Sequence, residues 1–415
     1  MEYVLKNKDR DVLRFGVEEI ETLVAGSDKN ITRKQEVLSD IKIINKDLLP
    51  INLDVSDITN SLRHWVNKRK VPSNREFVER IVATYEHPQK LMSYIDVSLA
   101  LSLNDSYWIV PADKEYKWKD YNLYNNEFSK ALELVAFGMQ DSYQARKSET
   151  SPEYTTNGML KKCWHRENGN IYLYKGSSRI YYKNAEAFSE YYMAQIAQAM
   201  SFECVSYDLV EFHNQVVSAC PIFTNENEGY VPMYQCLQTK IPVQVARDKQ
   251  ALIQEILKVY DKQSFQDMMV FDALIGNIDR HLGNFGMMID NNTNTLLRPA
   301  PIFDNGLSLM ARLSPHELHT IDISLANQTT YFDLGFDEQL SFYAQKRHLP
   351  ALENLSKFEF TKHPLCNVAD SILEPINVYI KQRALKAIEM IRGRKKSITK
   401  SKDLPKQPKP KPRKR

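Results

Sequence analysis

Two residue types suited to phosphate chemistry lie five positions apart in "NIDRHLGNF", the segment from Asn277 to Phe285. The segment is polar, although apolar runs precede it ("MMVFDALIG") and follow it ("FGMMI"). A carboxylate can orient a hydroxyl group and accept its proton, and Mg²⁺ prefers hard oxygen ligands such as carboxylate oxygens. Asp279 is therefore a candidate catalytic base, and Asn284 is a candidate metal ligand.

A second carboxylate, Asp304, follows downstream in "IFDNG". In protein kinases the catalytic Asp precedes a metal-binding Asn by five positions, and a metal-binding Asp comes later, before Phe-Gly. Asp279 and Asn284 keep this spacing, and Asn305-Gly306 stands in place of Phe-Gly. The pattern predicts a phosphotransferase site in which Asp304 is the other metal ligand.

The charged residues between the two candidates allow other interpretations. Arg280 is expected to pair with a carboxylate or with phosphate. His281 is expected to support the loop by hydrogen bonding, or else to carry a proton or bind the metal, and we place it with Asp279 in the catalytic group. Alternatively, Asp279, Arg280 and His281 form a buried salt-bridge network that has no catalytic role.

Phosphoryl transfer also needs a cation on the nucleotide phosphates, and protein kinases use a strand Lys paired with a helix Glu. Lys175 ends the alternating segment "NIYLYK", and Glu190 lies in the helical segment that follows. Lys161, Lys162 and Glu186 are rivals for these two roles. We favour Lys175 and Glu190 because the strand pattern before Lys175 is the clearest.

The sequence contains no G-x-G-x-x-G segment to cover the phosphates. The segment "EYTTNGMLKK" could serve instead, with the backbone N–H groups of Asn157 and Gly158 and the hydroxyls of Thr155 and Thr156. Asn-Gly favours a tight turn between strands because both residues tolerate positive φ. An ordinary β-turn that binds no ligand would explain the segment equally well.

Regular elements are expected on both sides of these residues. Alternating residues and two turn signals between 153 and 175 predict three short strands, and "NAEAFSEYYMAQIAQAM" has the apolar spacing of a helix. Further strands are expected in "CVSYDLVEFH" and "QVVSACPIFT", a helix in "FQDMMVFDALIG", and a strand pair in "FGMMID" and "TLLRPAPIFD". Strands followed by helices and a returning strand pair predict an α+β, bilobal, protein-kinase-like fold.

The length of 415 residues suits several domains. The expected division is an N-terminal accessory unit of mixed α/β elements at 1–148, a nucleotide-binding lobe at 149–240, a lobe with the catalytic loop at 241–391, and a disordered basic tail at 392–415.

Charge is distributed unevenly along the chain. The whole chain carries +3 and the tail +11, so the remainder carries −8. Lys and Pro alternate in the tail, which cannot bury apolar surface and is expected either to aid solubility or to contact nucleic acid or an acidic partner weakly. Five scattered cysteines, a charged N-terminus and the lack of a long apolar run predict a cytoplasmic protein with no transmembrane segment.

The motifs together resemble the HipA-type serine/threonine kinases, which include HipA toxins and CtkA-like kinases. The resemblance lies in "LIGNIDRHLGNFGMMID", "PAPIFDNG" and "NGMLKKCW…IYLYKG…SEYYMAQIA", and it covers about residues 150–330. It implies ATP and Mg²⁺ as cofactors and transfer of the γ-phosphoryl group to Ser or Thr of a protein. The family's catalytic Asp matches Asp279, its metal ligands match Asn284 and Asp304, and its ATP-binding Lys matches Lys175.

The resemblance also implies a toxin–antitoxin role, with a small DNA-binding antitoxin as a separate partner. The family's phosphate loop often contains an autophosphorylated Ser, and Ser151, Thr155 and Thr156 lie in this region here. Residues 1–148 do not resemble the family's short N-terminal subdomain. Two alternatives stay open: a phosphoinositide-type lipid kinase, because phosphatidylinositol kinases share D-R-H-x-x-N, and a nucleotide-binding pseudokinase that acts as a regulator.

Overall fold

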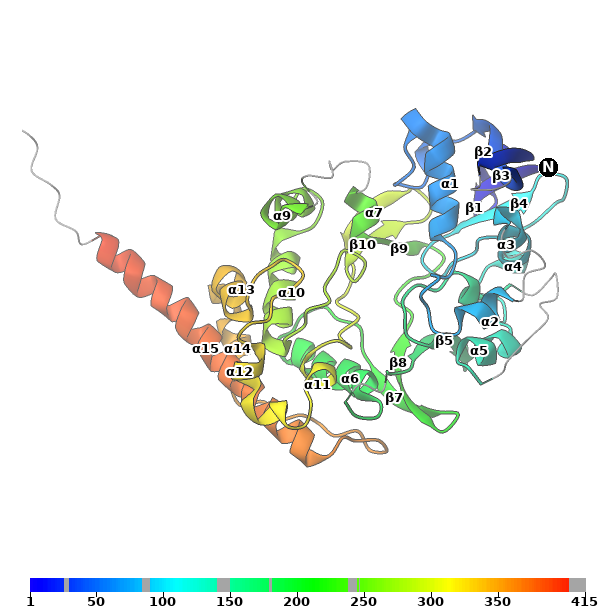
Figure 1. Ribbon diagram of the computed structural model, residues 1–415. Helices are drawn as coiled ribbons and strands as arrows, with labels where there is room; N and C mark the ends of the chain where they lie inside the picture. The colour runs from blue at the N-terminus through cyan, green and yellow to red at the C-terminus, as the bar shows by residue number, and fades with distance from the viewer. Residues whose placement is uncertain are drawn as a thin grey trace, which may run out of the picture.

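The structure is a computed structural model that describes residues 1–25, 30–83, 90–139, 150–178, 181–237, 245 and 247–402. Three antiparallel sheets follow one another along the chain, and a largely helical part completes the molecule. Figure 1 shows the first two sheets on one side, the helical part on the other and the third sheet between them.

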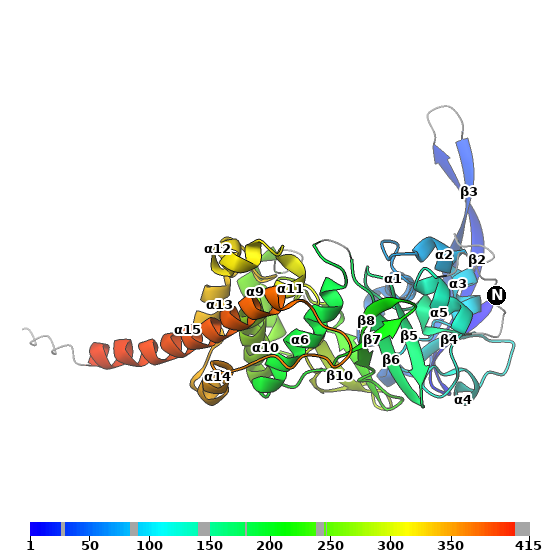
Figure 2. The ribbon, with the colours of Figure 1, turned by 90° about the horizontal axis from the view of Figure 1, so that it is seen from below.

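The first sheet belongs to the N-terminal accessory unit and has the strand order β3-β2-β1-β4. Its strands are β1 (Glu2–Asn7), β2 (Arg10–Ala25), β3 (Asn30–Ile43) and β4 (Tyr107–Pro111). The ends of β2 and β3 project from the body as a two-stranded arm (Figure 2). The helices of this unit are η1 (Lys46–Leu48), η2 (Val55–Asp57), α1 (Ile58–Lys68), α2 (Val78–Val82), α3 (Leu91–Ser98), α4 (Trp118–Tyr121) and α5 (Lys130–Ala136).

The second sheet has the order β5-β6-β8-β7. Its strands are β5 (Lys162–Glu167), β6 (Asn170–Lys175), β7 (Asp208–Phe212) and β8 (Gln215–Pro221), and the helix α6 (Ala185–Ala199) follows β6. The expected first strand before the Asn-Gly turn is wrong, because residues Pro152–Tyr154 form the 3₁₀ turn η3. Pro152 explains the difference: its fixed φ suits the first position of a helical turn.

The third sheet, β11-β10-β9, lies against the helical part. Its strands are β9 (Glu228–Pro232), β10 (Gly286–Asp290) and β11 (Thr295–Pro299). The helical elements are α7 (Met233–Leu237), α9 (Lys249–Ile256), α10 (Lys262–Ile275), α11 (Leu309–Arg312), η4 (Glu317–Thr320), α12 (Ile321–Leu325), α13 (Phe336–Tyr343), η5 (Lys346–His348), α14 (Leu349–Leu355) and α15 (Asp370–Lys402). The long helix α15 runs along the outer side of this part (Figure 1).

Helix α10 is the central helix of the C-terminal core. Its last residues are all buried, from Met268 to Ile275, as expected of a helix that is apolar all round. The Asp261 side chain accepts a hydrogen bond from Ser264 N at 2.8 Å and caps the start. Gly276 ends the helix with φ +63°, a conformation that glycine adopts without strain. The chain therefore leaves α10 directly into the polar segment.

The expected boundary at residue 148 falls among residues that the structure does not describe, and the division into separate domains stays a prediction. The accessory unit packs closely on the second sheet, because Val4, Trp108 and Ile171 share one apolar cluster. At the other end, α15 extends to Lys402, into the segment expected to be disordered. Residues 403–415 lie outside the described part. None of the helices that the structure describes is long and apolar enough to cross a membrane.

Candidate active site

Lys175 joins three elements at the centre of the site. It is the last residue of β6, and its Nζ donates to Glu190 Oε1 on α6 at 2.8 Å. The same ammonium contacts Asp304 Oδ1. Burial alone would lower the pKa of Lys175, but the carboxylates of Asp304 and Glu190 outweigh burial and raise it. Lys175 is therefore held charged between the two carboxylates.

The Asp304 turn is fixed from both sides. Asp304 has φ +58°, a conformation that Asp tolerates better than most residues, and its N–H donates to Tyr207 Oη at 3.0 Å. Glu190 Oε2 accepts from Asn305 N at 2.8 Å. A Cβ at Gly306 would lie only 3.3 Å from Glu190 Oε1, so glycine lets the turn approach α6 closely. Burial would raise the pKa of Asp304, but Lys175 and the neighbouring cations keep it below its ordinary value.

Asp279 and Asn284 contact each other at the end of α10. Asp279 N donates to Asn277 Oδ1 at 2.9 Å, and Asn284 Nδ2 donates to the backbone oxygen of Asp279 at 2.8 Å. The Asp279 side chain is half-buried, and burial is the main cause of a raised pKa, to which Asp304 adds. The loop therefore holds a carboxylate whose proton affinity is increased, near the Lys175–Asp304 contact.

Arg280 is the buried support of this loop. Its guanidinium makes three hydrogen bonds with the Asp272 carboxylate on α10, at 3.3, 3.0 and 2.9 Å. It also donates to the backbone oxygen of Asn284 at 3.0 Å and to Asn305 Oδ1 at 2.9 Å, and it contacts the backbone oxygen of Phe303. One side chain thus ties the catalytic loop to the Asp304 turn. Arg280 is expected from the sequence to pair either with a carboxylate or with phosphate. It pairs with a carboxylate, that of Asp272 and not that of Asp279.

His281 lies on the exposed side of the loop. Its Nδ1 accepts a hydrogen bond from Gly283 N at 3.0 Å. This contact fits the role of a hydrogen-bonding support for the turn that leads to Asn284. A role as a proton carrier stays a prediction.

The candidate phosphate loop differs from expectation in its side chains. The hydroxyls of Thr155 and Thr156 are buried and donate to the backbone oxygen of Pro152 at 3.2 and 2.7 Å. They are not directed outward, so the structure does not bring them to the site. Asn157 and Gly158 are exposed at the tip, and Gly158 has φ +97°. Of the four predicted residues of this loop, Asn157 and Gly158 are therefore the two that lie open to a ligand.

Lys162, a rival of Lys175 in the sequence, lies beside it. The two residues are paired directly across β5 and β6. Lys162 is 6% exposed, and a Cβ at Gly158 would meet its Nζ at 2.2 Å, so the ammonium lies against the loop tip. Its Nζ makes no hydrogen bond with any described residue. Burial, followed by the charge of Lys175, lowers the pKa of Lys162 to about 7.

The residues present fit a magnesium ion held together with phosphate. Because Asn284 Nδ2 is used by the loop backbone, the Asn284 Oδ1 atom, which accepts no hydrogen bond from the described residues, is available as a ligand. No group of three or more His, Cys, Asp or Glu side chains in the described part could hold a metal alone. Mg²⁺ commonly uses one or two protein carboxylates together with waters and substrate phosphates. Asn284 and Asp304 are therefore the residues that would hold such an ion.

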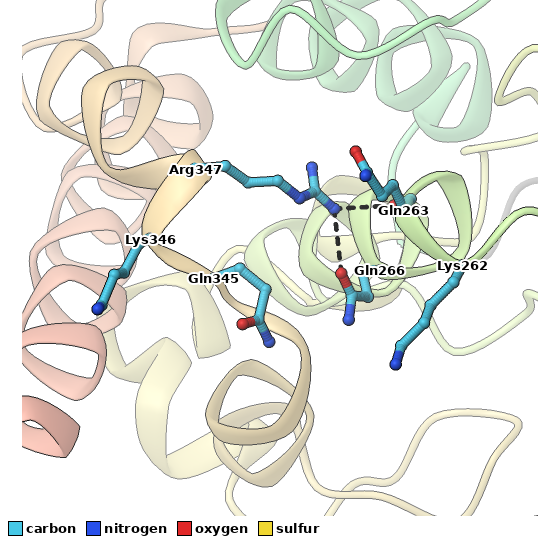
Figure 3. A pocket seen from close by; sticks show the side chains of 6 residues that line it. All are labelled: Lys262, Gln263, Gln266, Gln345, Lys346 and Arg347. Atoms are coloured by element: carbon cyan, nitrogen blue, oxygen red, sulfur yellow. Dashed lines mark hydrogen bonds between the residues drawn. The ribbon is translucent and has the colours of Figure 1, made fainter. Parts of the chain in front are cut away.

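A hollow of about 550 Å³ lies elsewhere, at the start of α10. It is lined by Lys262, Gln263, Gln266, Gln345, Lys346 and Arg347 (Figure 3). Arg347 donates across it to Gln263 and Gln266 and so joins η5 to α10. The catalytic loop follows the opposite end of this helix, roughly 20 Å away at 1.5 Å per residue. Because of this distance, the hollow is not part of the candidate active site, whatever its volume.

The fold and the site define a HipA-like protein. The model of the HipA-like C-terminal domain matches residues 138–359, more than half of the chain, so the chain belongs to this family. The matched range contains all ten predicted site residues: Thr155, Thr156, Asn157, Gly158, Lys175, Glu190, Asp279, His281, Asn284 and Asp304. Family membership confirms the resemblance and the predicted fold class.

Among individual relatives, the serine/threonine-protein kinase CtkA of Helicobacter pylori is 31% identical over 132 residues. The match covers 29% of this chain and 40% of that relative. Solved structures include H. pylori CtkA, with 20% identity, a TM-score of 0.46 and coverage of 57% of this chain and 95% of that one. Shewanella oneidensis HipA, in complex with HipB and operator DNA, has 12% identity, a TM-score of 0.48 and coverage of 94% and 97%.

Several residues that hold the site together were not predicted from the sequence. Asp272 accepts hydrogen bonds from Arg280 and Asn277. The one feature of the sequence that could have indicated this role is a carboxylate within an otherwise apolar helical segment. Tyr207 supports the Asp304 turn from a distant segment, and no local pattern could have indicated it. Arg75 reaches the phosphate loop from the accessory unit, which has no spacing relation to the loop.

Proposed function

We propose that this chain is an ATP- and Mg²⁺-dependent kinase that transfers the γ-phosphoryl group to a Ser or Thr hydroxyl of a protein. The observation that carries the proposal is the contact of the Lys175 ammonium with both Glu190 and Asp304. Protein kinases need a strand Lys paired with a helix Glu, and a metal-binding Asp, in one place. Membership of the HipA-like family and the partial match to CtkA support the proposal.

In this reaction Asp279 accepts the proton of the attacking hydroxyl. The raised pKa of its half-buried carboxylate increases its strength as a base, and its backbone contact with Asn284 keeps the loop in position. Arg280 does not meet the substrate, because its donors are already used by Asp272 and by loop carbonyls. It acts as a positioning residue.

The phosphates lie against the cations of the second sheet. Lys175, oriented by Glu190, contacts them directly, and Lys162 supplies a second positive charge beneath the loop tip. Asn284 and Asp304 would hold Mg²⁺, which when bound would neutralise phosphate charge and orient the γ-phosphoryl group. In the ligand-free structure Lys175 contacts both Glu190 and Asp304, so Asp304 would exchange this contact for the metal while Lys175 keeps Glu190.

Mass spectrometry of the full chain after incubation with ATP and Mg²⁺, with and without a generic protein substrate, tests the proposal. We expect phosphate on Ser or Thr with the wild type and at least ~100-fold less with Asp279→Asn, because a positioned base contributes ~100- to 10,000-fold. Asp322→Asn, which changes an exposed carboxylate on α12, serves as the matched control. Equal transfer by wild type and Asp279→Asn would remove Asp279 from the mechanism.

The same incubation with phosphoinositide vesicles added, together with a measurement of ATP binding, separates the alternatives. Phosphate on phosphoinositide vesicles but on no protein would favour a lipid kinase. Binding of ATP without any turnover would favour a pseudokinase regulator. Autophosphorylation, the toxin–antitoxin role and a small DNA-binding partner like the HipB found with Shewanella HipA stay predictions. Co-purification of the chain with such a partner is the direct test of the last.

A further inference from the structure

A short segment of the accessory unit, residues 71–76, lies along the candidate phosphate loop, residues 151–162. Two backbone N–H groups and the Glu76 carboxylate of this segment bond to the loop on both sides of its tip. The contacts are Val71 N to Tyr154 O at 2.9 Å, Glu76 N to Met159 O at 2.8 Å, and Lys161 N to Glu76 Oε2 at 3.2 Å. Some of the hydrogen bonds that hold the loop are therefore made with residues that precede the range matched by the family model, 138–359.

Arg75 is the central side chain of this contact. It is almost fully buried, and Nη1 donates to the backbone oxygens of Glu153 at 3.4 Å and Thr156 at 3.1 Å. Nη2 donates to Glu153 Oε2 at 3.0 Å and contacts the backbone oxygen of Lys162. One guanidinium therefore holds carbonyl groups at the start, the middle and the end of the loop.

Glu153 extends the contact into the second sheet. Its Oε1 accepts from Trp164 N on β5 at 2.7 Å, while Oε2 faces Arg75. Burial raises the pKa of Glu153 to about 7, against the opposing charge of Arg75. An ion pair with both side chains this deeply buried is sensitive to the loss of either partner. The geometry of the loop therefore depends on a residue of the accessory unit.

The position of the loop tip matters because of what lies under it. Gly158 rests against Lys162 Nζ, and Lys162 is paired across the strands with Lys175. A shift of the tip would change the cover over Lys162 and, through it, the surroundings of the neighbouring Lys175. A loop held in advance in its binding geometry loses less conformational entropy when a ligand binds.

We propose that Arg75 is a positioning residue through which the accessory unit sets the geometry of the phosphate loop, so that nucleotide affinity depends on this unit. The effect of Arg75 on nucleotide affinity rests on the proposed function. The effect of Arg75 on the geometry of the loop rests on the contacts alone. An experiment can therefore contradict either effect without contradicting the other.

The test compares Arg75→Met with Arg69→Met in the full chain. Arg69 is a matched control because it is a mostly buried arginine of the same unit, paired with Asp105 at 2.7 Å and bonded to Ala100 and Tyr107 rather than to the loop. Two quantities are measured: hydrogen exchange of the amides of residues 153–162, and the Kd for ATP with Mg²⁺ by calorimetry.

For Arg75→Met we expect faster exchange across residues 153–162 and a Kd at least ~10-fold higher, because pre-organisation of the loop is lost. Arg69→Met should lower thermal stability while leaving loop exchange and the Kd close to wild type. Arg75→Lys, which keeps the charge but not the two-armed contact, should give intermediate exchange.

Unchanged exchange of residues 153–162 in Arg75→Met would overturn the inference, whatever the Kd. Faster exchange with an unchanged Kd would overturn the part that concerns nucleotide affinity. Equal effects of Arg69→Met and Arg75→Met on both readouts would show a general loss of stability instead. Absence of ATP binding by the wild type would contradict the proposed function, and the exchange comparison would still decide whether Arg75 holds the loop.

Discussion

At the scale of single residues, the site contains two cations with different surroundings. Lys175 contacts two carboxylates, whereas the ammonium of Lys162, at the end of a largely buried side chain, has no hydrogen-bond partner among the described residues. A cation that is largely withdrawn from water and has no hydrogen-bond partner destabilises a fold, and such costs concentrate where a ligand is bound. Lys162 thus has the character of a binding residue, because an anionic ligand would supply the partner that the protein does not.

Lys162→Met should make the ligand-free protein more stable and weaken nucleotide binding. The pKa of Lys162 is lowered from 10.5 to about 7 in the fold, so the penalty is fully present below pH 7. It declines as the pH rises towards 10.5, since the unfolded chain then binds more protons than the fold. We expect a gain of about 1–3 kcal/mol below pH 7.

Thermal unfolding across this pH range, with and without ATP, checks the Lys162 prediction. The gain should shrink as the pH rises, and ATP should stabilise the variant less than it stabilises the wild type. A variant that is less stable than wild type at every pH would contradict the assignment.

At the scale of elements, the catalytic loop depends on the end of helix α10. Asp272 on this helix holds both Arg280 and Asn277, and Arg280 then holds the backbone of Asn284. Burial would lower the pKa of Arg280, but Asp272 more than offsets it, so the guanidinium stays charged. The helix, the loop and the Asp304 turn therefore behave as one connected unit.

Asp272→Asn should destabilise the fold by roughly 3–5 kcal/mol, because it leaves the buried charge of Arg280 without a counter-charge. Urea unfolding measures the effect. Glu255→Gln removes the partner of Lys258 on an exposed part of the surface and should cost at most about 1 kcal/mol. A similar small loss for both variants would show that the buried pair is not essential to the loop.

At the scale of the whole molecule, the accessory unit is docked against both neighbouring sheets. Trp118 Nε1 donates to Glu226 Oε1 at 2.7 Å, and Asn294 Nδ2 donates to the backbone oxygen of Leu49 at 2.6 Å. At the other end of the chain, α15 carries the basic segment away from the helical part (Figure 1). The acidic body and the basic tail are therefore separate charged regions of one chain.

Deletion of residues 403–415 tests the electrostatic role of the tail without interrupting α15. We expect the full chain to bind duplex DNA weakly, with an affinity that falls as salt increases, and the shortened chain to bind with a shallower dependence on salt. Fluorescence anisotropy at several salt concentrations measures both. The same affinity and salt dependence in the two chains would favour the solubilising role.

The sequence allowed prediction of those parts of the site that depend on local spacing. The Asp279–Asn284 loop between a helix and a strand, and the position of Lys175 at the end of β6, follow from periodicity and residue type. The orientation of Thr155 and Thr156 could not be predicted, because Pro152 replaces the expected strand with a 3₁₀ turn. Contacts such as Arg75 with Glu153 join residues 78 positions apart, and no local pattern encodes them.

We propose above that this chain transfers the terminal phosphoryl group of ATP and uses Asp279 to do so. The most direct measurement incubates wild type and Asp279→Asn with Mg²⁺ and with ATP labelled either at the γ- or at the α-phosphate. We expect protein label from γ-labelled ATP alone, and at least ~100-fold less of it with Asp279→Asn. Label from α-labelled ATP, or undiminished γ-label with Asp279→Asn, would contradict this proposal.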